Sequence, residues 1–189
     1  MRQSERKAAH RAAILDAAEL LLSQAGDDVS VEAIAHRAGL AKGTVYNHFA
    51  DKEALLRAVA RRVREAAAAR VADVVRDIQV APARLAAGMN VYLDLARDDP
   101  QRGAILVRII QDSTNPGAPI NAALLAEIER GIARGELDAQ PASAGVAAVL
   151  ALAQAAMVLV LGTGSRPADM AAARAMVGLA VKALATEKA

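Results

Sequence analysis

The sequence predicts an all-α protein of about nine helices, divided between a small N-terminal domain and a larger C-terminal helical domain. Aromatic residues make up only 2% of the 189 residues, whereas alanine, leucine and valine are abundant, and this composition favours helices over sheets. Apolar residues also recur at the three- and four-residue spacing of helices along most of the chain. A chain of this length is sufficient for one small module and one medium-sized domain.

The composition also limits the classes of function. With 54% hydrophobic and 23% charged residues, the chain is typical of a folded protein rather than a disordered one. It contains no cysteine, no glycine-rich phosphate loop and no pair of histidines at metal-binding spacing. We therefore predict no catalytic residue, no metal ligand and no cofactor, and we do not expect an enzyme. Residues 1–13 are polar and basic without an apolar core, so we expect a cytoplasmic protein.

Two helices are predicted before residue 40. Residues 8–25 place their apolar side chains on one helix face, and Gly26 can end this helix in a left-handed conformation. The Ser30 hydroxyl can then cap a second, short helix that stops at Gly39. Glu32 follows Ser30 too closely to complete a capping box.

The third predicted helix, residues 43–48, follows a turn of three or four residues and has little apolar content. Only Val45 and Phe49 are expected to be buried. A helix that enters the major groove of DNA needs a solvated polar face and a second helix that supports it across a tight turn. Residues 30–50 meet these demands, and the side chains expected to point outward are Lys42, Thr44, Tyr46, Asn47 and His48.

The same segment resembles the DNA-binding signature of the TetR family of transcriptional regulators. The resemblance is carried by Ser30–Ala35, Ala38–Phe49 and Lys52–Leu56, with Ile14–Ala18 upstream, and it covers about residues 8–68. It implies a helix-turn-helix DNA-binding domain over 8–68 and an effector-binding and dimerisation domain over 69–189.

The resemblance also implies roles for single residues. Lys42 and Thr44 would face base edges or nearby phosphates, while Tyr46, His48 and Lys52 would hold the DNA backbone. Lys52 opens a helix, and helix N-termini favour anions such as phosphate. Asn47 would contact a base or a phosphate. The DNA-binding residues predicted in this way are Ser30, Lys42, Gly43, Thr44, Tyr46, Asn47, His48 and Lys52.

The chain departs from the family pattern at Ala41, where a serine or threonine usually caps the recognition helix. Without that oxygen, we expect the first turn of the helix to be less stable.

Positive charge is concentrated at the N-terminus, and four residues of this N-terminal arm are expected beside the groove of the DNA: Arg2, Arg6, Lys7 and Arg11.

Six further helices are expected beyond residue 50. Asp51 can cap a long fourth helix that ends near Ile78. Pro82 and Pro100 fit the first turns of the next two helices. Residues 115–119 form a loop by composition, and the last three helices are expected over 120–134, 143–162 and 167–186.

Polar residues in the otherwise apolar C-terminal domain are candidates for a ligand cavity, because such cavities are mostly apolar with a few convergent polar groups. The predicted set is Met89, Asn90, Tyr92, Arg108, Gln111, Asp112, Gln154 and Met157. Arg108 and Asp112 can equally form a surface ion pair, and the two methionines can equally belong to the core. Because aromatic residues are scarce, we expect a small, largely apolar effector.

The segment from Ala139 to Ser165 contains no charged residue and has the length of a membrane span. Pro141 and Gln154 interrupt it and no basic cluster flanks it, so we expect no membrane partner. A helix that is apolar on all sides must instead be covered by protein. We therefore expect a homodimer formed through helices 143–162 and 167–186, as the family resemblance also implies.

Together these expectations describe a sequence-specific transcriptional regulator, located in the cytoplasm and on the nucleoid when DNA-bound. The first alternative is a repressor that leaves a palindromic operator on double-stranded DNA when a small-molecule effector binds. The second is a DNA-binding transcription factor that activates or that has no small-molecule ligand, since the binding module does not encode the sign of regulation.

Overall fold

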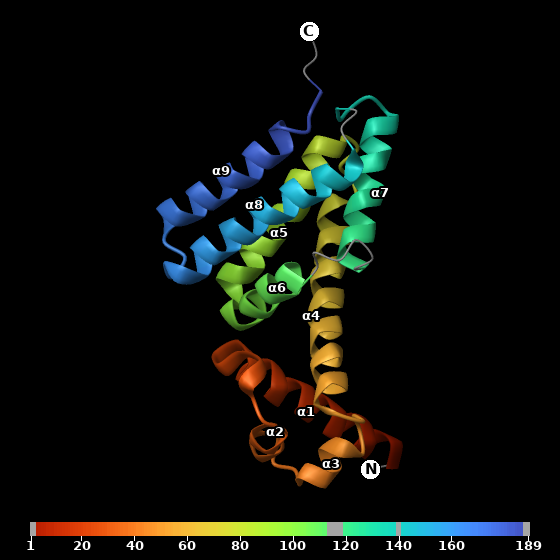
Figure 1. The fold of residues 1–189 in the computed structure, drawn as a ribbon, viewed down its shortest axis with the longest axis vertical. Helices are drawn as coiled ribbons and strands as arrows, with labels where there is room; N and C mark the ends of the chain where they lie inside the picture. Colours follow the sequence, from red (N-terminus) through yellow and green to blue (C-terminus); the bar gives the residue numbers. More distant parts are fainter. Residues whose placement is uncertain (1–2, 113–118, 139–140, 187–189) are drawn as a thin grey trace. The chain divides into compact units, whose positions relative to one another are not determined.

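The computed structural model describes residues 3–112, 119–138 and 141–186, and within these ranges it is all-α (Figure 1). The predicted fold class is confirmed: the described residues contain nine α-helices, a 3-10 turn and no strand. The elements are α1 (Gln3–Ala25), η1 (Gly26–Asp28), α2 (Val31–Arg37), α3 (Lys42–Tyr46), α4 (Lys52–Val75), α5 (Ala81–Asp98), α6 (Pro100–Asp112), α7 (Pro119–Ala133), α8 (Ala142–Gly162) and α9 (Pro167–Lys182).

The chain packs as two compact units, Met1–Val63 and Arg64–Ala189, which we call the first and second units. The boundary falls within α4, which supplies residues to both units. The domain boundary predicted at 68/69 is about one helical turn further along the same helix, and it stays a prediction.

The first unit is built around α1, α2, α3 and the beginning of α4. Ile14, Ile34 and Leu55 are completely buried and come from three different helices. Val45 and Phe49 are 1% and 6% exposed, so the prediction that these two residues anchor the third helix is confirmed. Burial of one face of each helix leaves the opposite face of α3 for other contacts.

In the second unit, α8 lies at the centre and contacts α5, α6, α7 and α9. Helices α8 and α9 run side by side in opposite directions (Figure 1). The buried residues of the two helices include small and β-branched ones, among them Ala156, Val160, Ala173 and Val177, each at most 1% exposed. Small side chains allow two helix backbones to approach closely.

Among the described residues, α8 is the helix that is long and apolar enough to cross a membrane, judged by length and composition alone. Buried core helices of soluble proteins have the same length and composition. Here α8 contacts four other helices of its unit, and these contacts account for the buried 39% of its apolar window.

The helix ends lie within about two residues of the predicted ones except in three places, and α3 spans Lys42–Tyr46 where residues 43–48 were predicted. Helix α1 begins at Gln3 rather than at residue 8, because its first turns are polar and carry no apolar periodicity. Helix α4 ends at Val75 rather than near Ile78. The Arg84 guanidinium binds this end of the helix and donates hydrogen bonds to the carbonyl oxygens of Val75 and Ile78 at 2.6 and 2.8 Å. Helix α9 ends at Lys182 rather than at residue 186, because the backbone beyond it pairs with the segment after α7, where the amide of Asp138 donates to the carbonyl of Leu184 at 2.8 Å. The predicted loop 115–119 lies mostly outside the described residues.

Candidate nucleic-acid interface and ligand cavity

The turn between α2 and α3 is closed by backbone hydrogen bonds. The amide of Leu40 donates to the carbonyl of Ala35 at 2.9 Å, and the amide of Gly39 donates to that of His36 at 3.1 Å. Gly39 has a φ of +68°, a left-handed conformation that favours glycine. This glycine therefore lets the chain reverse direction between the two helices.

The caps of α2 and α3 differ as predicted. The Ser30 hydroxyl accepts a hydrogen bond from the amide of Ala33 at 3.1 Å, which fixes the start of α2. Ala41 precedes α3 and offers no side-chain bond. The start of α3 is held instead by an ion pair between the Lys42 ammonium and the carboxylate of Glu32 in α2.

That ion pair lies on the surface, with 49% of the Lys42 side chain and 60% of the Glu32 side chain exposed. The hydrogen bond between them raises the pKa of Lys42 and lowers that of Glu32, so both groups are charged at neutral pH. The ammonium also lies 5.9 Å from the centre of the Tyr46 ring, which is a cation–π distance. Sequence reasoning identified Lys42 but missed the acidic partner.

The polar face of α3 is available for contact. Lys42, Gly43, Tyr46 and Asn47 are exposed, and the Tyr46 side chain remains 45% exposed although it is aromatic. The two other predicted contact residues of this segment, Thr44 and His48, are partly buried. The structure thus places these predicted residues on or at the edge of one solvated surface; their contacts with DNA stay predictions.

Residues of the N-terminal arm lie beside the end of this segment. The rings of His10 and His48 are 6.3 Å apart, and the Arg11 guanidinium lies 5.2 Å from the centre of the Phe49 ring. Burial lowers the pKa of His48, and the charges of Lys7, His10 and Arg11 lower it further. His48 is therefore neutral at neutral pH in the free protein, surrounded by positive charge. Arg2 lies outside the described residues.

Helix α4 begins beside the same surface. The Asp51 carboxylate accepts a hydrogen bond from the amide of Ala54 at 2.6 Å, which confirms the predicted cap. This cap occupies one of the amides at the helix start that a phosphate would use. The partly buried Lys52, the first residue of α4, stays a predicted phosphate contact.

A buried ion pair joins α4 to α1 within the first unit, and sequence reasoning missed it. Glu19 is only 8% exposed, and its carboxylate accepts a hydrogen bond from Nε of Arg62 at 2.7 Å. The same guanidinium lies 2.8 Å from the Asp16 carboxylate. The available signal was the position of Glu19 beside apolar residues of the buried face of α1.

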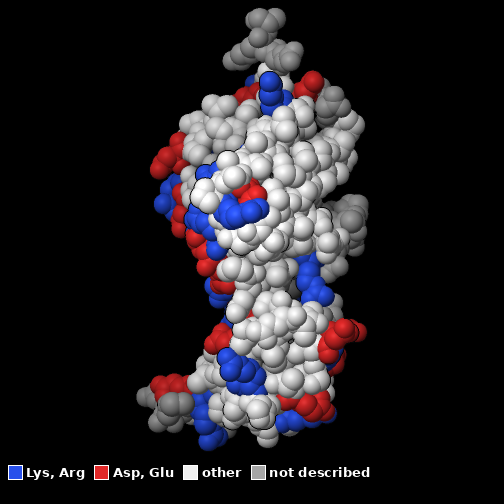
Figure 2. Space-filling view, turned by 90° about the vertical axis from the view of Figure 1, so that its left-hand side faces the viewer, with Lys and Arg blue, Asp and Glu red and all other residues white. Residues whose placement is uncertain are grey.

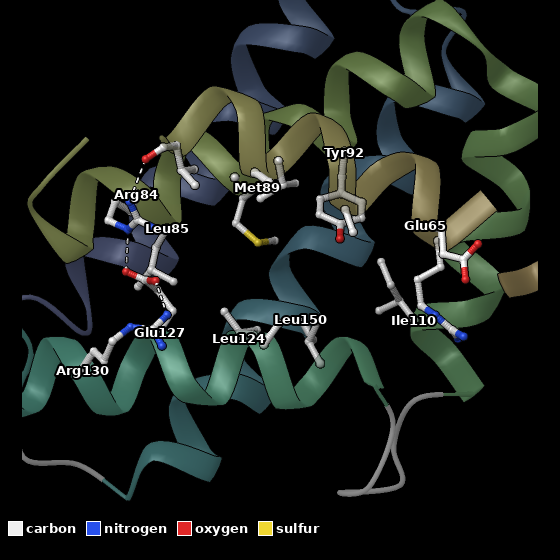
Figure 3. Close-up of a pocket in the computed structure, with 17 residues that line it drawn as sticks. Glu65, Arg84, Leu85, Met89, Tyr92, Ile110, Leu124, Glu127, Arg130 and Leu150 are labelled. Atoms are coloured by element: carbon white, nitrogen blue, oxygen red, sulfur yellow. Dashed lines mark hydrogen bonds and ion pairs between the residues drawn. The ribbon is translucent and has the colours of Figure 1, made fainter. Parts of the chain in front are cut away.

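The second unit contains a cavity of about 460 Å³, lined by α4, α5, α6, α7 and α8 (Figure 3). Its volume lies within the range typical of small-molecule sites. Most of the wall is aliphatic, with side chains from four of these helices: Val71, Leu85, Met89, Ile110 and Leu124.

Two of the eight residues predicted for the cavity line it, Met89 and Tyr92. In Figure 3 both side chains point from α5 into the cavity, and the hydroxyl group of Tyr92 faces its apolar interior. Burial raises the pKa of Tyr92, so its hydroxyl is protonated and can donate a hydrogen bond.

The other predictions for the cavity are corrected by the structure or lie outside it. Asn90 follows Met89 on α5, and consecutive residues of a helix point in directions about 100° apart, so it does not line the cavity. Met157 is completely buried in the helix core. The side chain of Asp112 lies outside the described residues. The remaining three also do not line the cavity, to which α6 and α8 contribute Ile110 and Leu150 instead: Arg108, Gln111 and Gln154.

One end of the cavity carries charged residues that sequence reasoning missed. The Glu127 carboxylate of α7 accepts hydrogen bonds from Nε of Arg84 at 2.8 Å and from Nη2 of Arg130 at 2.7 Å (Figure 3). Burial opposes ionisation of Glu127, but the hydrogen bonds from Arg130 and Arg84 hold its pKa below the usual value. The three-residue spacing of Glu127 and Arg130 was the one signal of this cluster in the sequence.

The outer faces of α8 and α9 are apolar and exposed. Val158 and Leu179 are 50% and 65% exposed, and exposed alanines continue the same stripe along α8 at Ala147, Ala151 and Ala155. In Figure 2 the face of the second unit toward the viewer is largely white, with charged side chains along one edge and one small charged group near its middle. Contiguous exposed apolar surface of this kind is typical of protein interfaces.

Comparisons with known proteins agree with this geometry. The family model of the bacterial regulatory proteins, tetR family, matches residues 14–59, the segment that contains α2 and α3. No curated protein matches the sequence.

Several solved structures have the same fold along nearly the whole chain. A TetR family transcription regulator from Marinobacter aquaeolei VT8 superposes with a TM-score of 0.80 at 20% identity, covering 98% of this chain and 100% of that one. A TetR family regulator from Agrobacterium tumefaciens gives 0.73 at 20% identity, covering 95% and 100%. A regulator from Saccharomonospora viridis, solved in complex with choline, gives 0.71 at 22% identity, covering 98% and 100%.

These relatives share the fold, and the family-specific segment is the one that forms the helix-turn-helix. Residues 14–59 thus match the model of the bacterial regulatory proteins, tetR family, and nearly the whole chain has the fold of solved structures described as TetR family transcription regulators.

Proposed function

We propose that the protein is a repressor that binds a palindromic operator as a homodimer and leaves it when a small, largely apolar molecule occupies the cavity of the second unit. The observation that carries this proposal is the polar, exposed face of α3, supported from behind by the buried Val45 and Phe49. A helix with these two faces can enter the major groove without disturbing its own core.

On the DNA, Lys42 and Thr44 contact base edges or adjacent phosphates. Tyr46, His48 and Lys52 contact the backbone and set the orientation of α3. Asn47, exposed at the end of α3, contacts a base or a phosphate, and Ser30 and Gly43 support the same surface.

Dimerisation through the apolar faces of α8 and α9 is supported by the exposure of Val158 and Leu179. A second copy of the chain brings the same surface, so the contact is self-complementary about a two-fold axis. Two recognition helices related by this axis match half-sites about 34–36 Å apart, or a multiple of that distance. The palindrome of the operator follows from this symmetry.

Ligand control is supported by the cavity, whose apolar wall carries the Tyr92 hydroxyl. The related regulator from Saccharomonospora viridis was solved with choline, so this fold accommodates small ligands. A ligand releases DNA only when it binds the released state more tightly than the DNA-bound state. Because it acts on DNA, the protein works in the cytoplasm, on the nucleoid when bound.

Nuclease footprinting of the promoter region beside the protein's own gene tests this proposal. The purified protein is expected to protect a palindrome, and the small-molecule extract of the host cells is expected to abolish that protection. Protection that extends along the DNA without sequence preference would contradict operator binding. A palindrome whose protection is unaffected by any fraction of the extract would contradict ligand release.

A further inference from the structure

The charges around the cavity of the second unit are unequally distributed, and this distribution bears on the chemistry of its ligand. At one end, Arg84 and Arg130 share the single carboxylate of Glu127 (Figure 3). Each oxygen of that carboxylate accepts a hydrogen bond from one of the two guanidiniums. Because two cations meet one anion, this end of the cavity carries a net charge of about +1.

The two guanidiniums retain hydrogen-bonding capacity toward the cavity. Arg130 uses Nη2 for Glu127, and among the described residues no partner is recorded for its Nε and Nη1; its side chain is 57% exposed. Arg84 is more enclosed, with 25% of its side chain exposed, and its bonds to Val75 and Ile78 hold it in place. An enclosed guanidinium beside an exposed one suits a carboxylate, which accepts hydrogen bonds on two oxygens.

The opposite end of the cavity gives no comparable attraction to a charged group. Glu65 lies there (Figure 3), and its chain neighbour Arg64 also lines the cavity with the opposite charge, so their fields cancel at a distance. Between the two ends the wall is aliphatic, formed by Met89, Leu124 and Leu150 among others. An anion is therefore favoured at one end and an apolar chain in the middle.

Tyr92 adds a second polar point within the apolar section. Its hydroxyl faces the cavity in Figure 3. This hydroxyl makes no hydrogen bond to another residue that the structure describes. A hydroxyl that is left without a partner in an apolar environment loses free energy relative to water. An oxygen on the ligand chain would satisfy this donor.

We propose that the ligand is an amphipathic carboxylate, with its carboxylate at Arg84 and Arg130 and its aliphatic chain along Met89, Leu124 and Leu150. This inference rests on the proposed function, because it gives the ligand class of the same cavity. It also adds a charge requirement that an entirely apolar effector lacks.

Calorimetric titration of the full-length protein without DNA tests the ligand class, with octanoate, octanol and octylamine as probes of equal chain length. Octanoate is expected to bind at least about tenfold more tightly than either other probe. Arg130→Gln is expected to remove most of that advantage while leaving octanol binding unchanged. Arg97→Gln, which removes an equal charge from α5 outside the cavity wall, serves as the matched control and is expected to bind octanoate as the wild type does.

Glu127→Gln gives an independent test, because it removes the carboxylate that competes for both guanidiniums. Octanoate affinity is expected to increase in this variant. Equal affinity for octanoate and octanol, or octanoate binding that Arg130→Gln leaves unchanged, would overturn the proposed ligand class. These titrations do not involve DNA, so an operator complex released by a neutral compound would then still support the proposed function.

Discussion

The ammonium group of Lys42, the first residue of α3, is paired with the carboxylate of Glu32, in the first turn of α2. The pair joins the supporting helix to the recognition helix at the point where Ala41 provides no cap. It also places a negative charge on the surface proposed to face DNA. Glu32 therefore has two opposing effects, since it orders the start of α3 and competes with phosphate for Lys42.

Glu32→Gln is expected to bind the operator a few-fold more tightly, because the variant releases Lys42 and removes a charge that repels phosphate. If Lys42 gains a phosphate contact, the slope of log K against log salt becomes steeper by up to about one unit. Fluorescence anisotropy with a labelled operator at several salt concentrations measures both quantities. Glu129→Gln, an exposed change of equal charge on α7, is the control; weaker binding by Glu32→Gln alone would show that the ordering effect of Glu32 dominates.

Ala41→Ser is expected to stabilise the first unit and to tighten operator binding modestly. A serine at this position can accept a hydrogen bond from a free amide of α3, which stabilises a helix start by about 0.5–2 kcal/mol. The measurement pairs chemical denaturation with an operator titration. Ala50→Ser, an exposed alanine after α3, gives the matched control. Unchanged stability together with unchanged or weaker binding would contradict this account of Ala41.

His48 is expected to make operator binding stronger as the pH falls. Its pKa in the free protein lies below the usual value because of burial and the neighbouring Lys7, His10 and Arg11, so the imidazole is neutral at neutral pH. A nearby phosphate favours the protonated form, and complex formation therefore takes up a proton. Affinity then rises as pH is lowered toward the free-state pKa, by at most about tenfold per pH unit for one proton.

Operator titrations between about pH 8 and pH 6 measure this dependence. His48→Gln is expected to flatten it, and His36→Gln, on the exposed side of α2, is expected to leave it intact. A dependence of the same steepness in His48→Gln and the wild type would assign the proton to another group.

Val158→Glu is expected to convert the proposed dimer to a monomer and to weaken operator binding strongly. Val158 lies on the outer face of α8 with 50% exposure, and a carboxylate buried twice across a two-fold axis is unfavourable. Val74→Glu is a closely matched control, since Val74 is also 50% exposed but lies on α4. Sedimentation velocity measures the outcome; a dimer that survives Val158→Glu and dissociates in Val74→Glu would place the interface elsewhere.

The local features of the first unit were predictable because they depend on neighbours in sequence. The spacing of Val45 and Phe49 specifies which side of the third helix is buried, and Gly39 marks a turn that needs a left-handed residue. The caps by Ser30 and Asp51 follow equally from the residues beside them. In contrast, the pair formed by Glu32 and Lys42 depends on how two helices cross.

The cavity was much less predictable, because its wall combines residues from five helices. Tyr92 and Met89 share one face of α5, but sequence alone did not specify that this face meets α7. Arg84 and Arg130 are typical surface residues by composition, and only their common partner Glu127 identifies them as part of the wall. Lone polar residues within apolar helices, such as Gln154, were a poor guide for the same reason.

The ratio of the affinities for an operator and for a non-operator duplex tests the central claim most directly. The measurement compares the dissociation constant for the footprinted palindrome with that for a scrambled duplex of equal length and composition, at physiological salt. Specific recognition by α3 predicts that the palindrome binds at least about 10³-fold more tightly. Equal affinity for the two duplexes, with only a steep dependence on salt, would contradict sequence-specific regulation by this protein.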